Sequence, residues 1–228
     1  FLRYAPHSRL VMMVREPIIN CESWIRAGIE AGDYYDVAAN IRTMLFGFDQ
    51  VAFRRQDSVG IRLEDLKARP EATIRAMCAW LGVSEAPSLY GMTAQGKKWW
   101  GDPSSPDYDE NKAMAPFAEA PKRPVGLVFS EQDQFIMRTL FYPFSVRFGY
   151  REPDPVGFKK DLAEIRPLFD DMFDFEKAIS ERSKIDPGQF KRRGSYLLLR
   201  AGLADRWDVL NEFKDYPHML SPLDITTE

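Results

Sequence analysis

The sequence predicts an α/β protein in which a parallel sheet is flanked by helices and followed by a helical extension. Two apolar runs, residues 9–14 (RLVMMV) and 59–63 (VGIRL), have the composition of strands that are buried on both faces. Each run precedes a segment with helical periodicity. Strands that alternate with helices in this way are typical of a parallel sheet.

The first helices follow from their start and stop signals. Pro17 can occupy the first position of a helix over about residues 18–31, and Gly32 then breaks the pattern. A second helix is expected over 34–54, with apolar residues at core-like spacing. These signals place two helices between the two strands.

Two more helices are predicted in the middle of the chain. Pro70 opens one that ends at Gly82. Ser130–Asp133 has the pattern of a capping box and opens another, which runs toward Tyr150 and is expected to kink at Pro143.

The sequence also predicts a division of the chain into two parts. Residues 1–150 hold both strands and are expected to be the C-terminal part of an α/β domain, preceded by further sequence. Residues 151–228 are expected to form a helical extension. This extension could cover an acceptor site, form a homodimer interface or dock another domain.

Composition restricts the class of protein. The chain has 228 residues, 45% of them hydrophobic, and a net charge of −3, which supports a sizeable core and argues against general nucleic-acid binding. We expect no transmembrane segment, because no apolar run approaches about 18 residues. Cys21 and Cys78 lack the spacing of a metal or disulfide site and are interpreted as reduced core thiols of a cytoplasmic protein.

The stretch MMVREPIINCESW, residues 12–24, carries the first candidate site. It places Arg15 at the end of a strand and Ser23 just inside the next helix. An arginine fork, a hydroxyl and a helix N-terminus together can bind a phosphate group. The alternative is structural: Arg15 pairs with Glu16 or another surface carboxylate, and Ser23 faces solvent.

Together with two later segments, this motif resembles the sulfotransferases that use 3′-phosphoadenosine 5′-phosphosulfate (PAPS). In that family a strand ends in Arg-x-Pro, a serine follows eight residues after the arginine, and a later strand leads into a Glu-Asp-Leu segment and a Pro-Glu helix. The matching residues here are Arg15, Pro17 and Ser23, then Leu63–Leu66, Pro70, Glu71, Leu81 and Gly82, and finally Phe148–Tyr150 at the end of the last matching helix.

The resemblance implies a sulfotransferase-like, P-loop-NTPase-like fold and a PAPS-dependent enzyme. It would transfer sulfonate from PAPS to a hydroxyl or amine of a small-molecule, lipid or carbohydrate acceptor, release adenosine 3′,5′-bisphosphate and need no metal. Arg15 and Ser23 would hold the 3′-phosphate. The family's phosphosulfate loop and its general base precede the first strand. We therefore expect both to lie outside this chain, and no catalytic residue is identified.

The loop GKKWWGDPSS carries the second candidate site. Lys97 and Lys98 could neutralise nucleotide phosphates, and Trp99 or Trp100 could stack on the purine. We expect this loop to become ordered when adenosine 3′,5′-bisphosphate binds. The alternative is a solvated lysine pair beside tryptophans that pack in the core.

Other functions compatible with the sequence are a PAPS-binding module without catalysis, a P-loop kinase, and a helical interaction protein in which Arg15 is structural. Glu64 and Asp65 could act as a base but are expected to organise the junction between strand and helix.

Overall fold

The computed structural model divides the chain into two compact units. The first comprises Phe1–Leu10, Arg15–Ser58 and Arg123–Ser221, and the second comprises Val11–Val14, Val59–Lys122 and Pro222–Glu228. The residues that the structure describes are 8–47, 49, 53, 57–91, 93–94, 97–98, 125–212 and 220–226.

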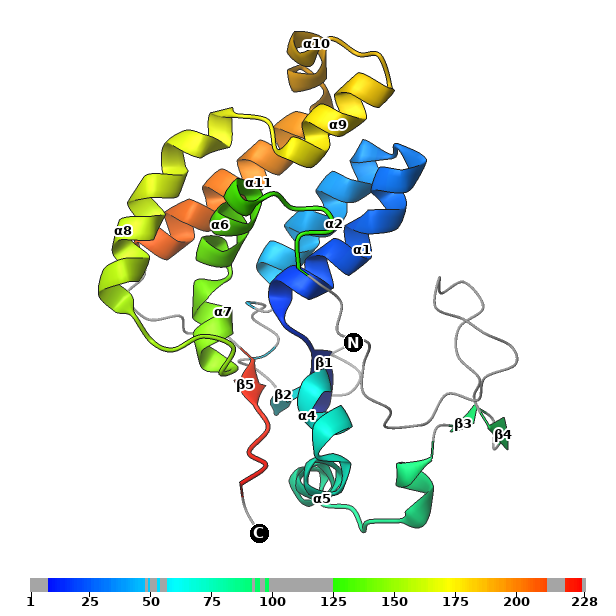
Figure 1. Ribbon diagram of the computed structural model, residues 1–228. Helices are drawn as coiled ribbons and strands as arrows, with labels where there is room; N and C mark the ends of the chain where they lie inside the picture. The colour runs from blue at the N-terminus through cyan, green and yellow to red at the C-terminus, as the bar shows by residue number, and fades with distance from the viewer. Residues whose placement is uncertain are drawn as a thin grey trace. The chain divides into compact units, whose positions relative to one another are not determined.

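The first unit is built from helices. Those in its described part are α1 (Pro17–Ala31), α2 (Tyr34–Gly47), α6 (Glu131–Leu140), α7 (Tyr142–Arg147), α8 (Pro155–Ile165), the 3-10 helix η2 (Arg166–Asp170), α9 (Asp174–Arg182), α10 (Pro187–Lys191) and α11 (Gly194–Glu212). Figure 1 shows α11 and α1 packed along α2, and these are the most extensive helix contacts in the unit. None of the described helices has the length and apolar character needed to cross a membrane.

The helix α1 is amphipathic, and this decides which face it buries. Ile18, Cys21 and Ile25 recur at steps of three and four residues, and all three are fully buried. Gly32 ends the helix at a φ of 72°, in the left-handed region that a residue with a side chain rarely adopts. The predicted helix over residues 18–31 is thus confirmed.

The hydrophobic core of the first unit includes residues from both sides of position 150. Ile41 and Leu140 belong to the same buried cluster as Phe169, Ile179 and Leu203. The sequence placed a boundary between 1–150 and 151–228, whereas the helices after Asp154 share a core with α1, α2 and α6. Periodicity shows which face of a helix is apolar, but it does not show which partner covers that face.

The second unit contains the small sheet. Its described elements are the strands β1 (Leu10–Val14), β2 (Ser58–Arg62) and β5 (Ser221–Pro222), the helices α4 (Leu63–Ala68), α5 (Pro70–Leu81) and η1 (Pro87–Tyr90), and the short strands β3 (Thr93–Ala94) and β4 (Lys97–Lys98). The first residue of β1, of β2 and of β5 is assigned to the first unit.

The predicted class, α/β with a parallel sheet flanked by helices, is confirmed. The strand order is β1-β2-β5, and the three strands are parallel. The amide of Leu223 donates to the carbonyl of Gly60 at 2.8 Å beside β5. Because β5 lies in the stretch assigned to a helical extension, that extension is not helical throughout.

The capping box at Ser130 and the kink at Pro143 are also confirmed. The Asp133 amide donates to the Ser130 hydroxyl at 3.2 Å, and the Ser130 amide donates to the Asp133 carboxylate at 3.3 Å. The helix then ends at Leu140, and α7 begins again with Pro143 in its first turn. Proline cannot continue the backbone hydrogen bonds of the preceding helix, which explains the break.

The close approach of α1 and α2 gives a first prediction. A Cβ atom on Gly28 would lie 2.9 Å from Cγ2 of Val37 and 3.0 Å from Oδ2 of Asp36. We expect Gly28→Ala to lower the free energy of unfolding by about 1–3 kcal/mol, because the two helices must separate. Chemical denaturation measures this change. Gly47→Ala is the matched control. A Cβ there meets no atom within 4 Å, so it should be neutral or stabilising, and an equal loss in both variants would contradict the explanation.

Candidate functional site

The structure places Arg15 at the junction that the sequence predicted. β1 ends at Val14, and α1 begins at Pro17, so Arg15 follows directly from the carboxyl end of a strand in a parallel sheet. The residue is half-buried, and its side chain forms no ion pair or hydrogen bond with any other described residue. The structural alternative, in which Arg15 pairs with Glu16, is therefore not found. The guanidinium is available for a ligand.

Ser23 lies on the second turn of α1 and is also half-buried. It shares one helix face with Ile19 and Asn20, which precede it by four and three residues. Ser23 already takes part in a polar contact within the protein. Arg15 and Ser23 belong to the same unit, at the start of the same helix.

The N-terminus of α1 is occupied by the protein's own carboxylate. Glu16 is the N-cap, and its Oε2 accepts a hydrogen bond from the amide of Ile19 at 2.7 Å. The sequence analysis had assigned this end of the helix to a ligand anion. The Glu16 carboxylate already accepts the amide of Ile19 and interacts favourably with the positive end of the helix dipole. A phosphate group bound here would therefore depend on the side chains of Arg15 and Ser23.

The second candidate site lies in the other unit. Lys97 and Lys98 form β4, which pairs antiparallel with β3 in the register Ala94 with Lys97 and Thr93 with Lys98. Trp99 and Trp100, on which the predicted ordering of the loop depends, lie outside the described residues, as do the side chains of both lysines. Arg15 and Ser23 belong to the first unit, whereas Lys97 and Lys98 belong to the second.

Asp65 organises the turn from α4 into α5. Its carboxylate accepts from Nη2 of Arg69 at 2.7 Å and lies 3.5 Å from Nε of Arg62. Its carbonyl accepts the Arg69 amide at 2.8 Å. These contacts agree with the structural role that the sequence analysis favoured over a catalytic one.

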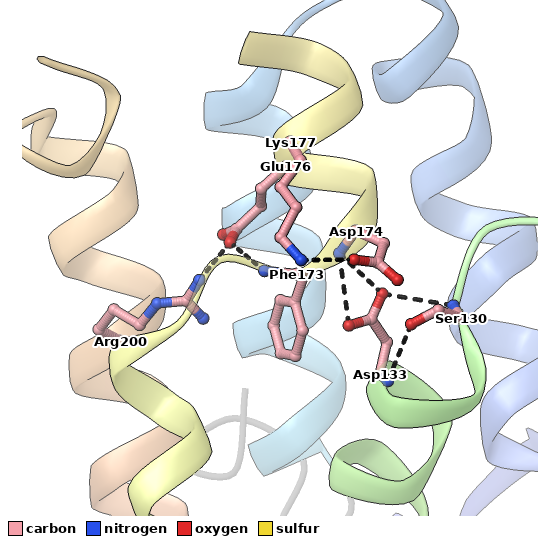
Figure 2. A network of polar contacts seen from close by, with 7 residues as sticks. All are labelled: Ser130, Asp133, Phe173, Asp174, Glu176, Lys177 and Arg200. Carbon is pink, nitrogen blue, oxygen red and sulfur yellow. Dashed lines mark hydrogen bonds and ion pairs between the residues drawn. The ribbon is translucent and has the colours of Figure 1, made fainter. Parts of the chain in front are cut away.

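A polar network that the sequence analysis missed joins four helices of the first unit. Figure 2 shows the two buried carboxylates of this network, Asp133 and Glu176. Asp133 caps α6, and it also accepts the amide of Asp174, the first residue of α9, at 3.1 Å. One buried carboxylate thus satisfies free amides at the start of two helices.

Glu176 is the second acceptor of this network, and it is completely buried. Its carboxylate accepts the amide of Phe173 at 2.8 Å, and it also binds the hydroxyl of Tyr34 on α2 and Nη2 of Arg200 on α11. The Arg200 guanidinium is centred 4.3 Å from the ring of Tyr196. The carboxylate therefore ties α2, α9 and α11 together.

The environment shifts the titration of these groups in a direction that burial explains. Burial raises the pKa of the Asp133 carboxyl and the pKa of the Glu176 carboxyl. For Glu176, the positive charge of Arg200 acts in the opposite direction and lowers the pKa, but burial has the larger effect. A raised carboxyl pKa means that the native state holds the proton more tightly than the unfolded chain. The contribution of each group to stability is therefore greatest at low pH and falls as the pH rises through the native pKa.

Two further buried charges have structural partners. The carboxylate of Glu22, on α1, accepts the amides of Gly126, Val128 and Phe129 at 3.1, 3.2 and 2.8 Å. Arg206, on α11, is 2% exposed and binds Asp49 as well as the carbonyl of Leu140. Within the described residues, no cluster of three or more His, Cys, Asp or Glu side chains could hold a metal ion.

The missed charges share a sequence signal. Glu22 falls on the apolar stripe of α1, between Cys21 and Ile25, and Arg206 falls on the stripe of α11 that includes Leu203 and Leu210. A charged residue on an apolar stripe must find a buried partner. This pattern could have identified both residues as structural anchors.

Comparison of the chain with protein-family models, with curated proteins and with solved structures found no match. The fold and the geometry of Arg15 and Ser23 are therefore the basis for any functional assignment.

Proposed function

We propose that the protein binds a nucleotide with a 3′-phosphate through Arg15 and Ser23 and acts as a PAPS-dependent sulfotransferase. The observation that carries this proposal is the half-buried Arg15. It lies at the carboxyl end of a parallel strand and has no partner among the described residues. Ligands of open α/β sheets bind at this edge of the sheet.

In this proposal Arg15 and Ser23 do not touch the sulfonate group. The planar guanidinium of Arg15 donates two parallel hydrogen bonds to the 3′-phosphate, and the hydroxyl of Ser23 donates a third. These contacts select a nucleotide with a 3′-phosphate over one without it and fix its position. Sulfonate transfer between two oxygens, or to a nitrogen, depends on such positioning and on charge stabilisation.

The second prediction tests the nucleotide site. We expect Arg15→Ala to weaken the binding of adenosine 3′,5′-bisphosphate by more than about 1.5 kcal/mol, because a charge-assisted hydrogen bond typically contributes about 1.5–3. Ser23→Ala should lose less, about 0.5–1.5 kcal/mol, because its hydroxyl is neutral. Isothermal titration calorimetry measures both affinities.

Two comparisons sharpen this experiment. Adenosine 5′-monophosphate lacks the 3′-phosphate, so its affinity should be equal in the wild type and in Arg15→Ala. Arg26→Ala is the control variant, because Arg26 lies on the same helix, is exposed and pairs with Glu30 at 2.8 Å. Unchanged binding of the bisphosphate by folded Arg15→Ala would remove Arg15 from the site. Nucleotide binding without turnover of labelled PAPS, in the presence of acceptor mixtures, would favour the non-catalytic module.

A further inference from the structure

The helix α11 carries apolar residues outside the face that it buries. Leu199, Leu203 and Leu210 belong to the core of the first unit. Leu197 and Ala201 lie on the other side of the helix, where Leu197 is 56% exposed and Ala201 is exposed as well. They are four residues apart and are therefore neighbours on one face. Single exposed apolar residues are common, so this strip alone does not identify a partner.

The charged residues around this strip are separated by sign. Arg192 and Arg193 directly precede the helix, and Asp205, Asp208 and Glu212 lie in its second half. All five are exposed. The three acids follow the strip in steps of three or four residues, so they share its face. Along its length, the exposed side of α11 thus changes from basic to apolar to acidic.

None of these five charges is paired within the described part of the chain. The guanidinium of Arg193 lies 5.6 Å from the centre of the Phe190 ring, a contact that keeps this charge beside the start of α11. The three carboxylates accept no hydrogen bond from another described residue. Charges of both signs are therefore available to a partner.

The order of these charges is the reverse of the order that stabilises an isolated helix. Acidic groups interact favourably with the N-terminus of a helix, and basic groups with its C-terminus. The first turn of α11 contains no acidic residue and its last turn no basic residue, whereas Arg193 precedes the first turn and Glu212 ends the last. A partner helix with its acids beside the arginines and its arginines beside the acids would offset this repulsion.

We propose that the exposed side of α11 is an interface between two copies of this chain, which pack with the two helices antiparallel. A two-fold axis near Leu197 and Ala201 brings each of these residues beside the other one of the second copy, and it brings Arg193 beside Asp205 in the same way. A second copy carries the complementary surface because an antiparallel α11 presents the same strip with its charges in the opposite order.

The expected dimer is weak. Its contact involves one helix of 19 residues from each copy, which places it among the small, transient interfaces. Charged pairs at the edge of such an interface are screened by salt, so a higher ionic strength should favour the monomer. The interface does not depend on the function proposed for Arg15 and Ser23.

The third prediction tests this interface by exchanging charges. Arg193→Glu places a carboxylate opposite Asp205, and Asp205→Arg places a guanidinium opposite Arg193, so each change should weaken dimerisation at least about tenfold. The double variant restores opposite charges and should recover the affinity to within a few-fold of the wild type. Sedimentation equilibrium measures the dissociation constant. The two residues are 12 positions apart, about 18 Å along one helix, so recovery can arise only between copies.

A control variant and the contrary outcomes complete the experiment. Lys159→Glu reverses an exposed charge on α8 and should leave the dissociation constant unchanged. All of these positions are exposed, so the variants are expected to fold, which circular dichroism checks. A wild type that stays monomeric at the highest attainable concentration would overturn the proposal. Dimerisation of Arg193→Glu with the wild-type constant, or a double variant that dimerises no better than the single variants, would also overturn it.

Discussion

Replacing Glu176 by alanine is expected to lower the free energy of unfolding by about 3–5 kcal/mol, the cost of breaking a buried ion pair by removing one partner. The change leaves the guanidinium of Arg200 without its carboxylate and removes the acceptor of the Tyr34 hydroxyl and of the Phe173 amide. Because these donors lie on α2, α9 and α11 or at their ends, we expect a loss of global stability. Urea denaturation followed by circular dichroism measures it.

Two further variants distinguish the loss of the polar network from a general effect of changing a residue on α9. Glu181→Ala changes an exposed glutamate of α9 and should alter stability by no more than about 0.5 kcal/mol. Adding Arg200→Met to Glu176→Ala removes the unpaired charge and should recover part of the loss, with a coupling of about 0.5–3 kcal/mol. A loss below about 1 kcal/mol for Glu176→Ala, or strict additivity of the two substitutions, would show that the network does not join the helices.

Replacing Glu22 by alanine is expected to lower the free energy of unfolding by a similar amount, about 3–5 kcal/mol. Its effect on hydrogen exchange should be confined to one segment. The carboxylate is the acceptor for the amides of Gly126, Val128 and Phe129. Phe129 is buried, and a buried amide that is left without a partner costs about 1–3 kcal/mol; the amides of Gly126 and Val128 are less buried and add to this loss. Amide hydrogen exchange over residues 126–130 should become faster than in the wild type, because the segment that leads into α6 loses its anchor.

The controls for Glu22 are on the same helix. Glu22→Gln keeps the size of the side chain and one carbonyl oxygen, so its loss should be smaller than that of the alanine variant. Glu30→Ala removes an exposed partner of Arg26, and such pairs are typically worth less than about 1 kcal/mol. If exchange over residues 126–130 stayed at the wild-type rate in Glu22→Ala, the carboxylate would not be what holds this segment.

The elements that the sequence predicted most closely are those whose limits are set by residues at their own ends. Pro17 and Gly32 set the limits of α1, and Pro70 and Gly82 set those of α5, because both residue types act through the allowed backbone angles of their own position. The strand β5 was not predicted. It has two residues, and its backbone bonds depend on β2, which lies far away in the sequence.

The candidate nucleotide site was also predicted from local sequence order, and the tertiary structure changed which groups at this site can bind a phosphate. The order strand, arginine, proline and helix places Arg15 at the end of a strand whatever the rest of the chain does. That Arg15 has no partner among the described residues, and that Glu16 caps the helix, are facts of side-chain geometry. The positions of acidic groups in space, unlike their positions in the sequence, decide which arginines remain available.

The sequence by itself determined the class of the fold, the limits of α1 and α5 and the position of the strand-to-helix junction that carries Arg15. These features follow from periodicity and from residues that act on their own backbone. Only the tertiary structure decided that Glu176 binds Arg200, which stands 24 positions away, and that Glu22 accepts the amide of Phe129. The physical reason is that a buried polar group is stabilised by atoms within about 3 Å, and chains that fold on themselves bring such atoms from distant residues.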